Sequence, residues 1–142
     1  MGTIDKIYLD SNFIIAALVS DHPQHPKSKE IIERHLKLKL LVSLLTLDEV
    51  IHTLNLAYNL SRLDLSFKVE SFLNSKEVKL CDAITTFNNP IKQYLHLYVD
   101  YNLSPRDTLH YLMMKANKIS HIATFDNDFI KNQKKLKIKV LN

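Results

Sequence analysis

The stretch SHIATFDNDFI, residues 120–130, begins as a short apolar run and changes abruptly to Asp-Asn-Asp at residues 126–128. The apolar character of residues 122–125 is typical of a strand that is buried on both faces of a parallel sheet. An Asp or Asn after such a strand suits a tight turn or the cap of a helix. The end of a strand is also where parallel sheets carry their functional crevice. The stretch therefore predicts a buried strand whose end is a candidate place for chemistry.

Segments of the same kind recur along the chain and alternate with helical periodicity. The other strands are expected at residues 6–9, 40–45, 78–81 and 138–141. Helices are expected at residues 11–19, 28–38, 46–60, 61–73 and 109–119 and from Pro90 onward, with a loop at residues 22–26. This alternation predicts an α/β fold in which helices cover both faces of a central parallel sheet of about five strands. Because the sequence has no repeat and no linker, residues 1–142 are expected to form a single domain.

The composition excludes several classes of site. Gly2 is the only glycine among 142 residues, which rules out the glycine-rich loops that bind nucleotide phosphates. The only cysteine, Cys81, excludes an intramolecular disulfide and a Cys-rich zinc site and favours a reducing compartment. No apolar run approaches the ~18 residues of a membrane span, and the N-terminus lacks the order of a signal peptide. We therefore expect a cytoplasmic protein without a membrane partner.

The chain is basic, with a formal net charge of +4. Five lysines lie between Lys131 and Lys139, so the C-terminal end is locally the most basic part. Basic domains often bind polyanions such as nucleic acids. A solvated lysine-rich surface explains the same charge, so charge alone does not choose between these two interpretations.

Four acidic residues follow a predicted strand or open a predicted helix: Asp10, Glu49, Asp107 and Asp126. In a parallel sheet the ends of the strands and the starts of the following helices share one edge, so these side chains are expected to meet. Two carboxylates ~4 Å apart repel each other by about 4 kcal/mol at an effective dielectric constant of ~20. A cluster of four therefore needs a cation, and oxygen ligands suit Mg²⁺ or Mn²⁺.

Each acid also has a purely structural explanation. Glu49 has the spacing of a capping box with Thr46. Asp107 would lie in the first turn of a helix that Ser104 caps. A turn or a cap accounts equally well for the other two acids. Only the joint placement of the four residues favours a functional site.

Two histidines lie one helical turn beyond an acid, in Glu49-x-x-His52 and Asp107-x-x-His110. The spacing is that of the Glu-x-x-His motif in di-iron helix bundles. Such a bundle needs four long helices, whereas this chain alternates strands with helices. We therefore interpret His52 and His110 as residues that pack on a helix face or contact the rim of the site.

Four short motifs follow one another along the chain, namely IYLDSNFII (7–15), VSLLTLDEV (42–50), LSPRD (103–107) and ATFDNDF (123–129). In their order and spacing they resemble the PIN-domain family of nucleases, in particular the VapC-type toxins of prokaryotic toxin–antitoxin pairs. Each motif is short, and the ordered set is what makes the resemblance specific. It covers nearly the whole chain.

The resemblance implies a three-layer α/β/α fold and hydrolysis of RNA by water that Mg²⁺ or Mn²⁺ activates. It implies catalytic and metal-binding roles for the matching acids, which are Asp10, Glu49, Asp107 and Asp126. Thr124 matches the polar residue beside the last acid, and Asp128 is an extra acid that we interpret as a helix cap or a neighbour of the ligands. Asn117 stands where the family has a glycine, and it is expected to adopt the left-handed conformation after the preceding helix.

The resemblance also implies partners, namely an RNA substrate and a small antitoxin protein. We expect a homodimer, because the apolar and aromatic residues at 61–73 exceed the needs of one small core. Two alternatives remain open. The chain could be a non-catalytic PIN-like domain that binds RNA or protein, or a PIN nuclease that acts in RNA processing and not as a toxin. Metal-dependent cleavage of RNA by the pure protein separates an enzyme from a binding domain.

Overall fold

A central sheet of five parallel strands organises the chain. The computed structural model describes residues 4–81 and 84–142. Its strands are β1 (Lys6–Leu9), β2 (Lys39–Val42), β3 (Lys79–Leu80), β4 (His121–Ala123) and β5 (Lys139–Leu141). They lie in the order β3-β2-β1-β4-β5, and every neighbouring pair is parallel. The parallel sheet expected from the sequence is confirmed.

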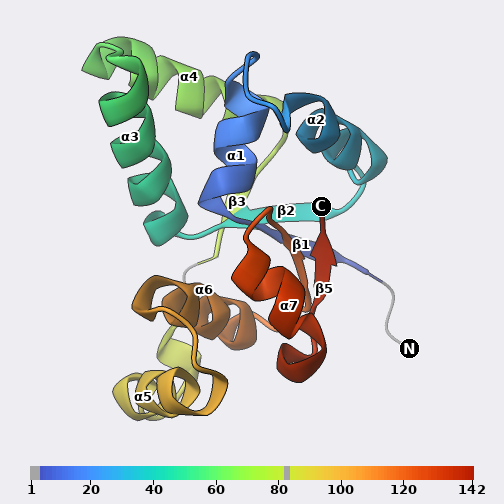
Figure 1. The fold of residues 1–142 in the computed structure, drawn as a ribbon, viewed down its shortest axis with the longest axis vertical. Coiled ribbons are helices and arrows are strands. Elements are labelled where there is room, and N and C mark those ends of the chain that lie inside the picture. The colour runs from blue at the N-terminus through green and yellow to red at the C-terminus, as the bar shows by residue number, and fades with distance from the viewer. Residues whose placement is uncertain (1–3, 82–83) are drawn as a thin grey trace.

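Helices cover both faces of this sheet (Figure 1). One layer contains α1 (Ser11–Leu18), α2 (His25–Arg34), α3 (Leu44–Tyr58) and α4 (Arg62–Ser75). The other contains α5 (Pro90–Tyr101), α6 (Pro105–Ala116) and α7 (Asn127–Leu136), preceded by a short 3₁₀ helix at Ile84–Thr86. The three-layer α/β/α arrangement is therefore confirmed. Among the described residues, no helix combines the length and the apolar character needed to cross a membrane.

Strand β1 shows how the sequence builds two cores. Ile7 and Leu9 point toward the layer of α1 to α4 and belong to the same apolar cluster as Phe13. Tyr8 points to the opposite face and joins Phe129 in the core beneath α5 to α7. The three β1 residues are at most 1% exposed. Complete burial on both faces is what a continuous apolar strand predicts.

The order of the strands reverses between β1 and β4. After β1 the chain adds β2 and β3 on one side, and it later places β4 and β5 on the other. Asp10, the first residue after β1, donates its backbone N–H to the carbonyl oxygen of Ala123 at the end of β4, at 3.0 Å. From this point α1 and α7 leave toward opposite faces of the sheet (Figure 1). Such a divergence opens a crevice at the carboxyl ends of the two strands.

Several helix boundaries differ from the expectation because caps decide them. Ser43 caps α3, and its Oγ accepts a hydrogen bond from the N–H of Thr46 at 3.2 Å. Thr46 thus lies inside the helix, and the capping-box explanation of Glu49 is wrong. Helix α2 begins at His25, so the end of the loop predicted at residues 22–26 is helical.

The left-handed residue after α6 is Lys118, with φ of 54°, and not Asn117, whose φ is −99°. The N–H of Ile119 bonds the carbonyl oxygen of Met114 at 2.9 Å, which closes the helix end. Asn117 instead donates its side-chain amide to the carbonyl oxygen of Met113 at 2.8 Å. The prediction of a left-handed Asn117 is wrong by one residue, because the asparagine completes the helix as its C-cap.

We predict that Lys118→Gly raises the free energy of unfolding by up to about 1 kcal/mol. A side chain in the left-handed region costs about 1–2 kcal/mol, and the extra freedom of glycine in the unfolded chain offsets only part of that gain. Asn117→Gly should instead lower the free energy of unfolding by about 0.5–1 kcal/mol. Equilibrium urea unfolding measures both variants, and the opposite order would contradict this description of the helix end.

Candidate functional site

The four predicted acids meet in the crevice beside β1 and β4. A pocket of about 340 Å³ is lined by Asp10, Ser11, Asn12, Glu49, Thr53, Ser104, Arg106, Asp107, His110, Asp126 and Asp128. The acids reach it from the end of β1, the second turn of α3, the first turn of α6 and the N-cap of α7. The expected convergence of all four in one pocket is confirmed.

Asp10 lies at the bottom of the pocket and is only 4% exposed. It caps α1, with Oδ1 accepting from the N–H of Ser11 at 2.8 Å. Its Oδ2 accepts from the hydroxyl of Thr124 at 2.7 Å. The pKa of Asp10 is raised above its ordinary value because burial outweighs the charge of His110 and the hydrogen bond from Thr124. The two hydrogen bonds hold the carboxylate in one orientation.

Thr124 connects the two segments that leave β1 and β4. Besides donating to Asp10, its hydroxyl oxygen accepts from the N–H of Asp126 at 3.0 Å. Next to it, Oδ1 of Asn12 accepts from the N–H of Phe125 at 3.1 Å. These bonds fix the first and the last acid relative to each other. The sequence indicated Thr124 only through its place beside the last acid, and the structure supplies the physical reason.

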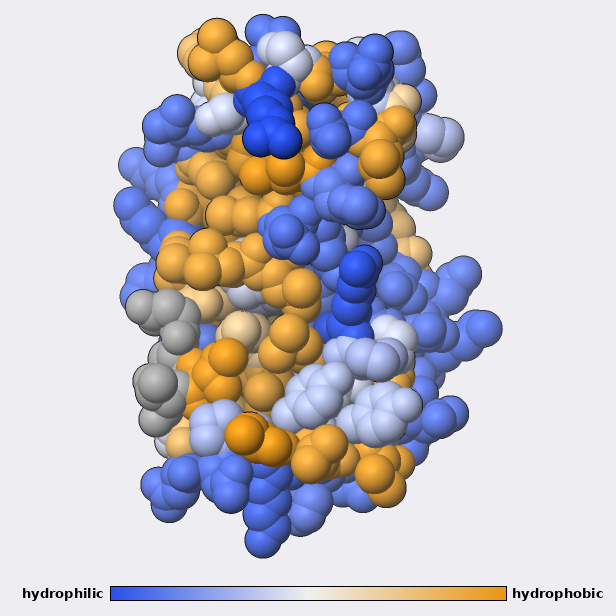
Figure 2. Space-filling model, turned by 90° about the vertical axis from the view of Figure 1, so that its left-hand side faces the viewer, coloured by the Kyte–Doolittle hydropathy of each residue, from blue (hydrophilic) through white to orange (hydrophobic). Residues whose placement is uncertain are grey.

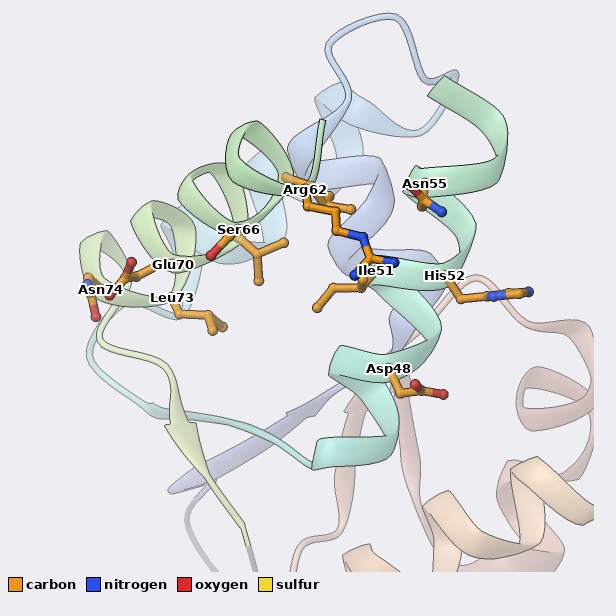
Figure 3. Close-up of a pocket in the computed structure, with 11 residues that line it drawn as sticks. Asp48, Ile51, His52, Asn55, Arg62, Ser66, Glu70, Leu73 and Asn74 are labelled. Carbon is orange, nitrogen blue, oxygen red and sulfur yellow. The ribbon is translucent and has the colours of Figure 1, made fainter. Parts of the chain in front are cut away.

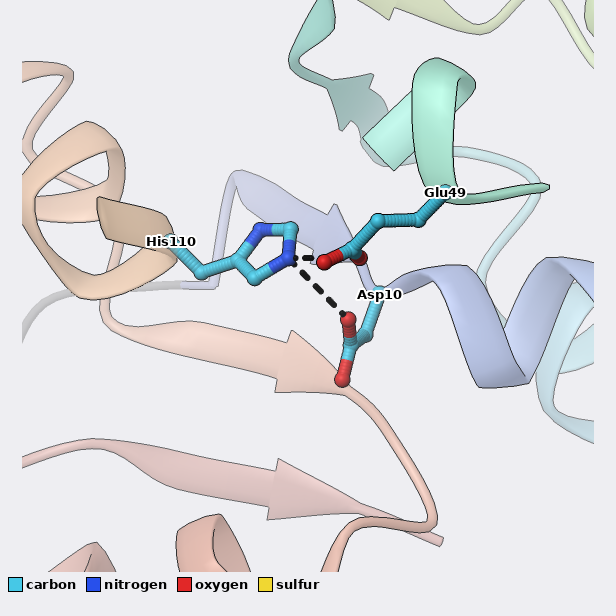
Figure 4. A group of neighbouring side chains, drawn as sticks. All are labelled: Asp10, Glu49 and His110. Atoms are coloured by element: carbon cyan, nitrogen blue, oxygen red, sulfur yellow. Dashed lines mark hydrogen bonds and ion pairs between the residues drawn. The ribbon is translucent and has the colours of Figure 1, made fainter. Parts of the chain in front are cut away.

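His110 lies inside the site and not at its rim (Figure 4). Its side chain is 1% exposed, its Nε2 donates to Oε2 of Glu49 at 2.9 Å, and the same atom lies 3.7 Å from Oδ1 of Asp10. On the other side of the ring, Nδ1 lies 2.6 Å from the hydroxyl of Tyr8. His110 packs on Tyr8, as a packing residue would, but it also lines the acidic pocket, and its placement at the rim is wrong. The available signal was its spacing of one helical turn from Asp107, which places both on one face of α6.

Electrostatic attraction links His110 to the carboxylates of Asp10 and Glu49, the inner pair of acids. Burial alone would lower the pKa of His110, but its hydrogen bond to Glu49 and the charge of Asp10 raise the pKa above its ordinary value. Burial acts to raise the pKa of Glu49, yet the hydrogen bond and charge of His110 bring it below its ordinary value. The charge of Arg106 lowers the pKa of Glu49 further, by a smaller amount. The Arg106 side chain is 70% exposed, and its Nε lies 3.9 Å from Oε1 of Glu49.

Asp107, Asp126 and Asp128 form a second, more exposed group at the same pocket. They offer carboxylate oxygens within 4.8 Å of one another. Burial, together with the charges of Asp126 and Asp10, raises the pKa of Asp107 to about 6. Asp126 caps α7, and its Oδ1 accepts from the N–H of Asp128 at 2.7 Å. The interpretation of Asp128 as a helix cap is therefore wrong, because Asp126 takes that place.

The chemistry of both groups fits a divalent cation. Asp10, Glu49 and His110 also offer ligand atoms within 4.8 Å of one another. Carboxylate oxygens are the ligands that Mg²⁺ and Mn²⁺ prefer. Burial is the main reason for the raised pKa of Asp107, and the negative charges of Asp126 and Asp10 raise it further. A bound cation would favour the ionised form of this carboxyl group.

A larger hollow, of about 690 Å³, lies between α3 and α4 (Figure 3). Ile51 and Leu73 contribute apolar surface to it, and Arg62 and Glu70 contribute opposite charges. The exposed side chain of His52 lines this hollow and not the acidic pocket. None of the four predicted acids lines this hollow.

The pKa of Asp107 makes stability depend on pH. Because its folded-state pKa of about 6 exceeds the ordinary value of 3.8, folding becomes less favourable as the pH rises through this interval. We predict that Asp107→Asn, which cannot ionise, melts several degrees above wild type near pH 7 in the presence of chelator. The difference should shrink near pH 4.5, where the folded wild type keeps the proton.

Thermal melts at the two pH values measure this effect. Asp100→Asn, at an exposed position of α5, is the matched control and should shift the melting temperature equally at both. A stabilisation by Asp107→Asn that does not change with pH would contradict the raised pKa of Asp107 described above.

Comparison with known proteins identifies the family of this chain. The family model of the PIN domain matches residues 7–135. A search of curated proteins found no match. Among solved structures, VapC20 of Mycobacterium tuberculosis, described as a Sarcin-Ricin loop cleaving toxin, superposes with a TM-score of 0.65. The two are 19% identical, and the match covers 88% of this chain and 93% of that one.

Two further structures have the same fold. VapBC2 from Rickettsia felis, bound to a DNA fragment from their promoter, gives a TM-score of 0.68 at 18% identity and covers 95% of this chain and 96% of that one. FitAcB from Neisseria gonorrhoeae gives 0.60 at 17% identity, with 96% of each chain covered. At these identities the structural matches show a shared fold alone. The family model, however, matches most of the chain by sequence, over a range in which all four acids lie. The chain therefore belongs to the PIN-domain family.

Proposed function

We propose that this protein is a Mg²⁺- or Mn²⁺-dependent endoribonuclease, and that it is the toxin of a toxin–antitoxin pair. The observation that carries the proposal is the meeting of four carboxylates from four separate elements in one pocket. Concentrated negative charge destabilises a fold unless a cation offsets it, and the charges of Asp126 and Asp10 add to the burial that raises the pKa of Asp107. Membership of the PIN-domain family supports a nuclease.

The residues of the pocket would have different roles in the reaction. Asp10, Asp107 and Asp126 are the proposed ligands, and Glu49 would bind a second ion or orient the attacking water. When bound, the cation would supply positive charge at the phosphate and lower the pKa of the attacking water. No side chain of the protein needs to act as a nucleophile in this reaction.

Several features around the pocket favour the binding of phosphate. Helices α6 and α7 both begin at its wall, and the N-terminus of a helix carries partial positive charge. Arg106 extends into solvent beside Glu49. Lys131 is exposed on α7, one turn beyond Asp128. These cations would contact RNA phosphates on either side of the cleaved bond.

We propose a small antitoxin-like protein as the partner of the hollow between α3 and α4. The relative from Rickettsia felis was solved as VapBC2, which supports a partner of this kind. The hollow offers apolar side chains, including Ile51 and Leu73, between charges of both signs. This combination suits an amphipathic segment of a second protein. A small reading frame beside the gene for this chain would be its source.

We also propose a homodimer. Apolar side chains that do not line the hollow project from α3 and α4, with exposed fractions of 70% for Leu56, 80% for Leu63 and 72% for Phe67. Helix α5 presents a second apolar set, in which Ile91 and Val99 are each 75% exposed. Figure 2 shows apolar surface gathered on the side of the molecule where α3 and α5 lie in Figure 1. Exposed apolar surface of this extent marks interaction sites.

Asp126→Asn is predicted to reduce metal-dependent cleavage of a structured RNA by about 100-fold or more without unfolding the protein. Asparagine caps a helix as well as aspartate does, so the substitution keeps the cap of α7 and removes only the charge. Asp10→Asn should have the same effect for the same reason. Cleavage assays with and without chelator, run beside thermal melts, measure both consequences.

Asp64→Asn is the matched control, because Asp64 is also an acid at the start of a helix but lies on α4, outside the pocket. It should retain full activity. Full cleavage by Asp126→Asn, or cleavage by wild type in excess chelator, would overturn the proposed function.

Sedimentation of the wild type at micromolar concentration should give a species of twice the 16.5 kDa of one chain. Phe67→Glu places a charge on the outer surface of α4 and should yield a single chain, whereas Val99→Glu on α5 should leave the dimer intact. If only Val99→Glu separates the two chains, the interface lies on α5 and not on α4. A wild type that sediments as a single chain would refute the dimer.

A further inference from the structure

One buried group in the pocket has no part in the reaction proposed above. The Nε2 of His110 points between the carboxylates of Asp10 and Glu49, at 3.7 Å from Oδ1 of the first and 2.9 Å from Oε2 of the second (Figure 4). An ion with bonds of ~2.1 Å holds adjacent ligands ~3 Å apart and opposite ligands ~4.2 Å apart. Both distances from Nε2 are compatible with ligands of one ion, and the three residues offer ligand atoms within 4.8 Å of one another.

Contacts with Tyr8 hold His110 in its orientation beside the inner carboxylates. The residue is 1% exposed, and its ring packs edge-to-face on Tyr8, with centroids 5.6 Å apart and an interplanar angle of 69°. Rotation of the ring would break the 2.6 Å contact between Nδ1 and the hydroxyl of Tyr8. An ion bound between the carboxylates would repel a proton on Nε2, so in this orientation the imidazole would present the lone pair of Nε2 to the ion.

Tyr8 supplies the partner that this tautomer needs. Its hydroxyl lies 2.6 Å from Nδ1 of His110, 2.7 Å from Oγ of Ser43 and 3.1 Å from Oγ1 of Thr46. A phenol can accept a hydrogen bond from Nδ1–H while it donates its own proton to a neighbouring hydroxyl. Metal-binding histidines almost always donate their second N–H to an oxygen in this way.

We propose that Nε2 of His110 is a direct ligand of a divalent cation that it holds together with Asp10 and Glu49. This inference rests on the proposed function, in which carboxylates alone bind the metal, and adds a nitrogen ligand to the inner half of the pocket. Imidazole favours first-row transition ions, whereas Mg²⁺ strongly prefers oxygen. The inner group would therefore select Mn²⁺ over Mg²⁺, and the group of Asp107, Asp126 and Asp128 would accept either ion.

Mn²⁺ itself reports which atoms bind it. Pulsed electron paramagnetic resonance of the protein loaded with Mn²⁺ should show coupling to ¹⁴N, and protein labelled with ¹⁵N-histidine should show the ¹⁵N pattern instead. His110→Gln should lose this coupling and weaken Mn²⁺ binding about 10–100-fold, with a much smaller change for Mg²⁺ in calorimetric titration. His52→Gln, at an exposed position of α3, is the matched control and should change neither result.

The wild-type spectrum decides the matter even if His110→Gln fails to fold. Bound Mn²⁺ without histidine nitrogen coupling would overturn the inference and leave the proposed metal-dependent nuclease standing. Coupling that persists in a folded His110→Gln variant would assign the nitrogen to another histidine, and it would also overturn the inference. Failure of the wild type to bind either ion would remove both this inference and the proposed function.

Discussion

The parallel pairing of β1 with β4 is the contact on which the rest of the site depends. The two strands are far apart in the chain, and the hydrogen bond from Thr124 to Asp10 spans 114 residues. Because the strand order reverses at this pair, the following helices diverge and leave the ends of both strands accessible. Glu49 and Asp107 are placed relative to these two strands from the second turn of α3 and the first turn of α6, which pack on opposite faces of the sheet. A slip in the β1–β4 register would separate Asp10 from Thr124 and dismantle the pocket.

The structural and the functional explanations of the acids turn out to be compatible. Asp10 caps α1 and Asp126 caps α7, and both line the same pocket. A capping carboxylate accepts backbone N–H groups, which fixes its rotamer and offsets part of its charge. The caps are thus the means by which the chain positions its carboxylates. His110 offsets further negative charge from within, since it contacts Glu49 and faces Asp10.

The sequence predicted the sheet, the layers and the meeting of the acids, because these follow from local pattern and from the general topology of parallel sheets. It did not predict the place of His110. That place depends on how α6 packs over β1, where Tyr8 looked like an ordinary core residue and proved to be the hydrogen-bonding partner of the imidazole. The left-handed position was misplaced for a related reason. Whether Asn117 or Lys118 takes it depends on where the last turn of α6 closes, and the composition of the segment does not specify that.

Helices α6 and α7 begin together at the acidic pocket and also end together, at a surface lined by Lys115 and Lys137. At a rise of ~1.5 Å per residue these helices separate the two ends by roughly 15–18 Å. Lys115 and Lys135 lie over the rings of Tyr111 and Tyr101, which keeps positive charge at the far end. Along these two helices the side-chain charge is therefore polarised, with acids in the first turn of each and lysines in the last. This arrangement complements both helix dipoles, because negative charge is favourable at the N-terminus of a helix and positive charge at its C-terminus.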